Sequence, residues 1–234
     1  MDEAEHVGAE GHEAAPDHPA LDEPALDPAC ELPAHDPAGH DDPVLDHDGP
    51  WSEEDFRILT AKGIAHGDGR AELIDGALVV GPGQTEAGEW TIAYTRTMLG
   101  KGLPDGLRVV GPVALRMGTD CVLVPDLVVM RAAGETDGAP ESVVDAEEVL
   151  MVVEIVGPEH GAMDRSFKPQ IYARARLPYL LLVDHDVPFA VASMVISGRY
   201  HEYARASGIE ALELEEPFRL RMPPAERDRR TEPG

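Results

Sequence analysis

Two carboxylates stand inside apolar runs that otherwise have the composition of buried strands. Glu154 lies in Val149–Val156, and Asp126 lies in Cys121–Met130. A charged carboxylate in a buried strand is unfavourable unless it is paired with a cation or bound to a metal. If the two strands are neighbours, side-chain alternation brings both carboxylates to one face, where their oxygens suit Mg²⁺. A bound divalent cation activates water and neutralises phosphodiester charge, so the pattern points to hydrolytic phosphoryl transfer.

Each carboxylate also has an ordinary structural interpretation. An Asp in a β-rich run often ends a strand or occupies a bulge, and a buried Glu is often paired with Arg. Glu72, expected on one arm of a hairpin, is either a third oxygen donor for the metal or a brace of that hairpin. The pattern alone leaves metal binding and structural roles open.

The elements that position these residues follow from hydrophobic periodicity and turn signals. Ala71–Val80 predicts a hairpin because Asp75-Gly76 favours a two-residue turn, and the polar stretch Gly134–Ala146 predicts a loop. The pattern also predicts helices over Trp51–Ala61 and Glu89–Leu99 and one that opens near Asp164, and strands over Leu107–Met117, Cys121–Met130 (a hairpin-like pair), Val149–Val156, Tyr179–Asp184, Phe189–Ile196, Arg199–Ala204 and Phe218–Met222. This mixture predicts an α/β fold with a mixed central sheet flanked by helices.

An acidic segment precedes the folded part. Residues 1–50 contain 15 Asp and Glu, no Lys or Arg, and six His, without apolar periodicity. Such a segment cannot bury enough apolar surface to offset its ordering entropy, so we expect a disordered tail. Its histidines either bind Zn²⁺ or Ni²⁺ weakly or belong to a tail that solubilises the protein. The remainder divides into a domain over residues 51–222 and a polar tail over residues 223–234.

The expected location follows from segments that the sequence lacks. The N-terminus has neither the basic nor the apolar region of a signal peptide, and no run approaches the roughly 18 apolar residues of a membrane span. Cys30 and Cys121 make no disulfide framework. We therefore expect a cytoplasmic protein without a membrane partner.

Three segments in a fixed order carry a family resemblance. They are ELIDG (Glu72–Gly76), VPDLVV (Val124–Val129) and VVEIV…DRSFKPQIYA…LPYLLLVD (Val152–Asp184). Together they resemble the Uma-two family, a branch of the PD-(D/E)XK nuclease superfamily described as "putative restriction endonuclease", over about residues 51 to 204. The resemblance implies a restriction-endonuclease-like fold and a DNA endonuclease that depends on Mg²⁺ or Mn²⁺. It implies Asp126 and Glu154 as the metal-binding pair.

The catalytic lysine of the superfamily is displaced in this chain. The superfamily motif places a Lys two residues after the Glu, and here that position is Val156. Many family members instead carry a Lys on the following helix in a D-R-x-x-K pattern, which here spans Asp164 to Lys168. If the helix starts at Ser166, Lys168 falls in its first turn, near the carboxyl end of the Glu154 strand. The resemblance implies Lys168 as a catalytic residue that orients water or stabilises the phosphate.

Glu72 and Asp164 are additional site candidates. Glu72 matches the first-motif Glu of the family and would complete the metal shell, or it braces the hairpin. Asp164 acts in catalysis or caps the helix N-terminus. Lys168 itself has the alternative of a solvated lysine at a helix start, and Tyr172, four residues later, is expected to pack beneath it.

Several features depart from the family pattern. The turn after the Glu strand reads Gly157-Pro158-Glu159, and Gln84 lies in the region where a His often precedes the second helix.

Residues after position 50 hold 30 acids against 19 bases, whereas duplex DNA binding relies on clustered Lys and Arg. The clustered basic residues are Arg174/Arg176, Arg219/Arg221 and Arg227/Arg229/Arg230. The alternative is therefore a catalytically inactive nuclease-fold module that binds or regulates. For the active enzyme, DNA is the expected partner, and cutting both strands favours a homodimer.

Overall fold

The computed structural model describes residues 47–61, 69–132, 143–157, 161–184 and 189–224. The chain divides into two units, Met1–Asp42 and Pro43–Gly234, and every described residue belongs to the second unit. The expectations for the acidic tail before His47, for residues 134–142, for Glu159 and for the C-terminal tail after position 224 lie outside the described residues.

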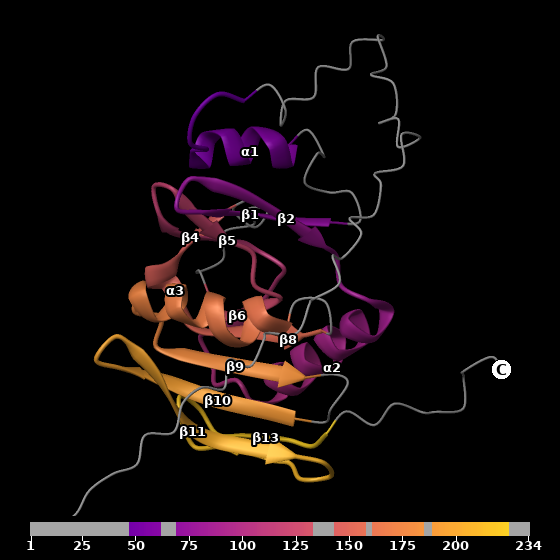
Figure 1. Cartoon of the computed structure of the whole chain (residues 1–234). Coiled ribbons are helices and arrows are strands. Elements are labelled where there is room, and N and C mark those ends of the chain that lie inside the picture. The colour runs from indigo at the N-terminus through magenta and orange to yellow at the C-terminus, as the bar shows by residue number, and fades with distance from the viewer. Residues whose placement is uncertain (1–46, 62–68, 133–142, 158–160, 185–188, 225–234) are drawn as a thin grey trace, which may run out of the picture. The chain divides into compact units, whose positions relative to one another are not determined.

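The described part alternates short strands with a few helices (Figure 1). The helical elements are α1 (Glu53–Ala61), α2 (Glu86–Gly102), a 3₁₀ turn (Ala146–Glu148), a π-helical segment (Met163–Phe167) and α3 (Lys168–Arg174). The strands are β1 (Gly69–Ile74), β2 (Ala77–Pro82), β3 (Leu107–Val110), β4 (Ala114–Gly118), β5 (Cys121–Leu123), β6 (Leu127–Arg131), β7 (Val143–Asp145), β8 (Val149–Val156), β9 (Tyr179–Asp184), β10 (Phe189–Ile196), β11 (Arg199–Ser207), β12 (Leu212–Leu214) and β13 (Leu220–Met222). None of the described helices combines the length and the apolarity that a membrane span requires.

The described strands form three sheets, and the mixed α/β class expected from the sequence is confirmed. One sheet has the order β2-β1-β5-β4-β7, the second has the order β11-β10-β9-β8-β6-β3, and β12 pairs with β13. In the six-stranded sheet, β8 runs parallel to β9 and antiparallel to β6. A parallel pair needs a crossover connection, and α3 supplies it between β8 and β9.

The side chains of β8 alternate between two cores on opposite faces of the six-stranded sheet. Val153 and Ile155 belong to the core that includes residues of α2, whereas Val152 belongs to the core that includes Tyr172 of α3. Glu154 has the parity of Val152, so its side chain points toward α3. Alternation along one strand thus places the carboxylate beneath the crossover helix.

The two long β-rich runs are each broken, which corrects the sequence prediction. Leu107–Met117 forms β3 and β4, and Cys121–Met130 forms β5 and β6. Because β3 pairs with β6 in one sheet and β4 pairs with β5 in the other, the hairpin-like pair passes through both sheets. Pro112 and Pro125 fall in the two breaks, where a missing N–H cannot continue a ladder. Asp126 therefore lies in a bend between strands, not in the middle of one strand.

Other element boundaries also differ from the prediction. The expected loop Gly134–Ala146 ends in β7, which runs parallel to β4 and buries Val143 and Val144. The strand β12 was not predicted; its Leu-Glu-Leu alternation extends over only three residues. Helix α2 begins at Glu86, where the Thr85 hydroxyl accepts from the Gly88 N–H at 3.1 Å.

The helix that carries Lys168 begins earlier than predicted. Gly161 and Ala162 are already helical, and the π-helical segment follows before α3. The Lys168 N–H donates to the Met163 carbonyl, five residues back. Pro169 has no N–H to donate, so the wider turn before it loses no backbone hydrogen bond of the helix at that position. Lys168 is thus in the second turn of the helix, not in the first.

Gly111 packs directly against the backbone of the bend that carries Asp126. Its φ is +143°, and a Cβ there would stand 2.3 Å from the Asp126 carbonyl oxygen and 2.8 Å from Leu127 Cα. We expect Gly111→Ala to displace the bend that carries Asp126 and to lower the free energy of unfolding in urea by about 1–3 kcal/mol. Gly118→Ala is the control, because its nearest new contact is an ordinary 3.8 Å. Equal losses in both variants would contradict this account.

Candidate active site

Five residues singled out from the sequence meet at one buried place. Glu154 near the end of β8, Asp126 in the bend before β6, Glu72 on β1, and Asp164 and Lys168 on the helix between β8 and β9 form the carboxylate cluster. Each is at most 6% exposed. Segments from across the sequence converge here because the bend at Asp126 joins the two sheets, and the crossover helix covers the strand from which Glu154 projects (Figure 1).

Lys168 is the cation at the centre of the carboxylate cluster. Its Nζ lies 3.1 Å from Glu72 Oε1, 3.2 Å from Asp164 Oδ1 and 3.5 Å from Glu154 Oε1. Burial by itself lowers the pKa of an ammonium, but the surrounding carboxylates, Glu154 foremost, hold the pKa of Lys168 well above its ordinary value. Lys168 is therefore a permanent buried cation and not a solvated lysine.

Asp126 is held by donors that the sequence analysis did not assign to the site. Its Oδ1 accepts from the Arg70 guanidinium at 2.6 Å and from the Gln84 side-chain amide at 2.9 Å. Its Oδ2 accepts from the backbone N–H of Ile155, the residue that follows Glu154 in the chain, at 2.7 Å. One indication for Arg70 was present in the sequence: it precedes Glu72 by two residues, and strand alternation places both side chains on the same face. Gln84, in the loop between β2 and α2, had only the indirect signal that it lies in the region where a His often precedes the second helix of the family.

Glu154 carries the least satisfied oxygen of the carboxylate cluster. The Tyr172 hydroxyl donates to Glu154 Oε1, so Tyr172 binds the carboxylate and does not simply pack beneath Lys168. Glu154 Oε2 is buried and has no hydrogen-bond partner among the described residues. Burial raises the pKa of Glu154 to about 8; Lys168 opposes the rise, and the neighbouring carboxylates add to it.

Glu72 and Asp164 hold the surrounding elements together. Glu72 Oε1 accepts from the Val124 N–H at 2.9 Å as well as from Lys168, so it joins β1 to the chain that leads to Asp126. Asp164 lies one helical turn before Lys168 and forms an ion pair with it. Both residues restrain the position of the ammonium.

The carboxylate cluster leaves carboxylate oxygens open and carries an excess of negative charge. Four carboxylates face two cations, Lys168 and Arg70, so an excess of negative charge remains when all are ionised. Asp126 Oδ2 has one protein donor and keeps a lone pair, and Glu154 Oε2 has none. Within the described ranges no group of three or more His, Cys, Asp or Glu is arranged to hold a metal ion. Two protein oxygens with the remaining positions open suit Mg²⁺, which keeps several waters.

The comparisons with known proteins agree with this fold. It is restriction-endonuclease-like, and it is similar to the crystal structure titled as a "putative nuclease belonging to DUF820" from Anabaena variabilis ATCC 29413. That likeness has a TM-score of 0.51 at 14% identity and covers 63% of this chain and 82% of the other. The Uma2 family model, "Putative restriction endonuclease", matches residues 53–223. The chain belongs to this family. No curated protein matches the sequence.

Proposed function

We propose that this protein is a metal-dependent endonuclease that hydrolyses phosphodiester bonds in DNA. The single observation that carries the proposal is the unpartnered Glu154 Oε2 within a buried carboxylate cluster that also holds a cationic lysine. An unpaired buried oxygen is unfavourable, and a ligand that removes the penalty is expected where one persists. Membership of the Uma2 family supports the nuclease class.

Each residue of the carboxylate cluster has a role in this proposal. Asp126 and Glu154 would hold Mg²⁺ or Mn²⁺, which when bound lowers the pKa of water and neutralises phosphate charge. Arg70 and Gln84 orient the Asp126 carboxylate through its Oδ1 and leave Oδ2 partly open. Lys168, held between carboxylates, offers its ammonium to the attacking water or to the charge that develops on phosphate.

Cleavage of a supercoiled plasmid tests the proposal. With Mg²⁺ or Mn²⁺ we expect the full-length protein to nick or linearise the plasmid, and we expect a chelator to stop the reaction. Asp126→Asn removes a metal ligand while keeping the shape of the side chain, so the rate should fall by at least about 100-fold. Asp105→Asn, on an exposed turn, is the matched control. A rate unaffected by Asp126→Asn would contradict the proposal.

One observation favours the alternative of a catalytically inactive binding module. Asp126 Oδ1 already accepts two hydrogen bonds, so its lone pairs are filled without a metal. An inactive module would bind DNA equally well with and without Mg²⁺ and would leave the plasmid intact at every metal concentration. The same plasmid assay, run beside a binding measurement, separates the two functions.

A further inference from the structure

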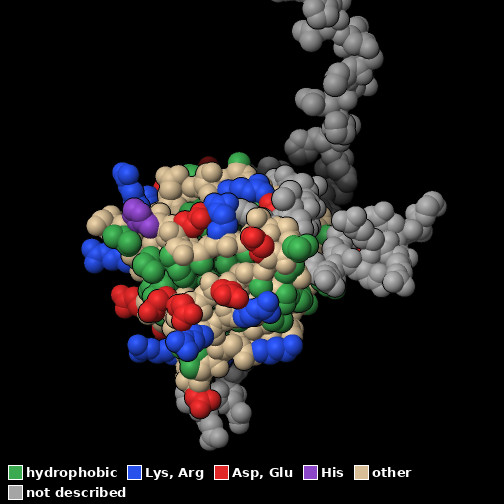
Figure 2. Space-filling view, turned by 90° about the horizontal axis from the view of Figure 1, so that it is seen from below, with side chains coloured by type: hydrophobic (Ala, Val, Ile, Leu, Met, Phe, Trp, Pro, Cys, Tyr) green, Lys and Arg blue, Asp and Glu red, His purple; other side chains and the backbone are tan. Residues whose placement is uncertain are grey.

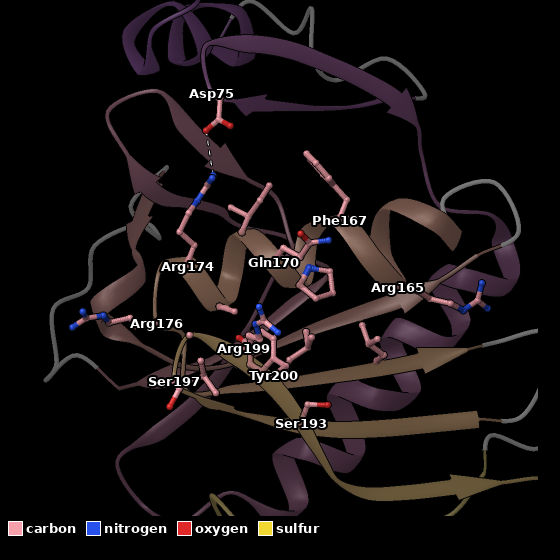
Figure 3. Close-up of a pocket in the computed structure, with 17 residues that line it drawn as sticks. Asp75, Arg165, Phe167, Gln170, Arg174, Arg176, Ser193, Ser197, Arg199 and Tyr200 are labelled. Atoms are coloured by element: carbon pink, nitrogen blue, oxygen red, sulfur yellow. Dashed lines mark hydrogen bonds and ion pairs between the residues drawn. The ribbon is translucent and has the colours of Figure 1, made fainter.

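A broad groove lies on the face of α3 opposite the carboxylate cluster (Figure 3). Lys168 and Tyr172 project from α3 into the buried cluster, whereas Phe167, Gln170 and Arg174 line the groove. Its remaining walls come from β9, β10 and β11. Its volume is about 1270 Å³, which exceeds the roughly 300–1,000 Å³ of small-molecule sites. The size favours an extended ligand.

The groove is basic in a strongly acidic protein. Arg165, Arg174, Arg176 and Arg199 line it, and we call it the arginine groove; Asp75 is the one acidic residue in its lining. The whole chain has a net charge of −26. A concentration of guanidinium groups against this background requires an explanation beyond solubility.

Two of the four arginines retain unpaired charge. Arg165 forms an ion pair with Asp184, and Arg174 lies 3.2 Å from Asp75. Arg176 and Arg199 are exposed and form no ion pair with any described residue. These two guanidinium groups are available to an anionic ligand.

Several arginines on other surfaces are paired with carboxylates. Figure 2 shows a face on which Lys and Arg side chains are interspersed with Asp and Glu. The pairs Arg205–Glu202, Arg219–Glu215 and Arg221–Glu213 are examples from β11 and the segments around β13. The arginine groove differs from these three pairs in that Arg176 and Arg199 have no carboxylate partner among the described residues.

The backbone at Arg176 gives an independent reason to assign a role to its side chain. Arg176 follows the end of α3 with φ of +61°, and the Leu177 N–H donates back to the Tyr172 carbonyl. This is the position of a helix C-terminal cap where glycine is strongly preferred, because a side chain is strained there. An arginine at this strained position indicates that its side chain contributes something glycine cannot.

The groove also presents surfaces that suit bases. Phe167, the last residue of the π-helical segment directly before α3, is 44% exposed, and Tyr200 lines another wall of the groove. Gln170, Ser193 and Ser197 add neutral hydrogen-bonding groups (Figure 3). Phe167 is the exposed ring, whereas Tyr200 is half-buried and its hydroxyl donates to the Leu177 carbonyl. Guanidinium groups along a groove with an exposed aromatic ring are typical of sites that track a nucleic-acid backbone and stack a base.

We infer that the arginine groove binds the phosphodiester backbone of a nucleic-acid strand at a site separate from the carboxylate cluster. Arg165 follows Asp164 directly in the chain, so one end of the groove lies at the helix end that carries the cluster. A strand in the groove would be held by Arg176 and Arg199 and led along α3 toward the cluster. The choice of nucleic acid as the anion rests on the proposed function.

Fluorescence anisotropy with labelled single-stranded and duplex DNA tests the inference on the full chain in a chelator. The double variant Arg176→Gly with Arg199→Ala should weaken binding about tenfold and reduce the slope of log K against log salt by about one to two. The control pair Arg219→Ala with Arg221→Ala removes the same charge and should change binding less than about twofold. Equal weakening by both pairs, or an unchanged affinity in the groove variant, would overturn the inference.

The Arg176→Gly variant separates binding from folding. Because glycine suits φ of +61°, this single change should raise Tm by about 2–4 °C while it weakens DNA binding. A stable variant with full affinity contradicts the groove site. Displacement of DNA by a polyglutamate peptide at equal charge would instead assign the groove to an acidic polypeptide. If the wild-type protein binds DNA through the groove but never cleaves it, only the proposed function is contradicted. If the wild-type protein cleaves DNA and the groove variant binds with unchanged affinity, only this inference is contradicted.

Discussion

Replacement of Lys168 by Met is expected to abolish DNA cleavage and to lower the free energy of unfolding by about 3–5 kcal/mol. The ammonium is nearly inaccessible and faces three carboxylates within 3.5 Å. Methionine fills a similar volume but brings no charge, so the buried carboxylates of Glu72 and Asp164 would lose their shared cation. Breaking a buried ion pair from one side is costly because the remaining charges stay uncompensated.

Urea denaturation of the metal-free protein and plasmid cleavage measure the two effects of Lys168→Met. Lys101→Met is the matched control, since Lys101 is exposed at the end of α2 and the same change should cost little. A variant as stable as wild type and fully active would show that Lys168 has neither role.

Asp126 and Glu154 were recognisable from the sequence because they are carboxylates in apolar runs. Lys168 was predicted from the resemblance to the Uma-two family, through its D-R-x-x-K pattern. These signals are short-range and survive without knowledge of the fold. The structure brings the three residues into one cluster, although Asp126 reaches it from a bend and Lys168 from a second helical turn.

The contacts that Arg70 and Gln84 make with Asp126 could not be predicted from residue type and local sequence pattern. Arg70 is a single arginine before ELIDG, and its partner is 56 residues away in the sequence. Gln84 is a neutral residue in a glycine- and proline-containing loop, and its partner depends on how that loop meets the Asp126 bend. Both contacts arise from the passage of two strands from one sheet to the other. Apolar periodicity reports burial along a strand but not which sheet the strand joins.

Replacement of Glu154 by Gln is expected to have opposite effects on activity and on stability. The amide keeps the shape of the side chain but weakens metal binding, so cleavage should fall by at least about 100-fold. Removing one negative charge from a cluster with excess negative charge should stabilise the metal-free fold at alkaline pH. Glu210→Gln, at an exposed position, is the control and should change neither property.

The pH dependence of this stabilisation follows from the pKa of Glu154, which burial raises to about 8 in the folded protein, against roughly 4.3 in an unfolded chain. Between these values the folded state binds the extra proton, so the stability that Glu154 contributes is full below about pH 4.3 and is lost as pH rises through about 8. Thermal unfolding in a chelator should therefore show wild type losing Tm relative to Glu154→Gln between pH 5 and pH 9. If the Tm values of wild type and Glu154→Gln instead change in parallel over that interval, Glu154 is already ionised at pH 5. The buried Oε2 would then not be an uncompensated oxygen, contrary to the description of the candidate active site.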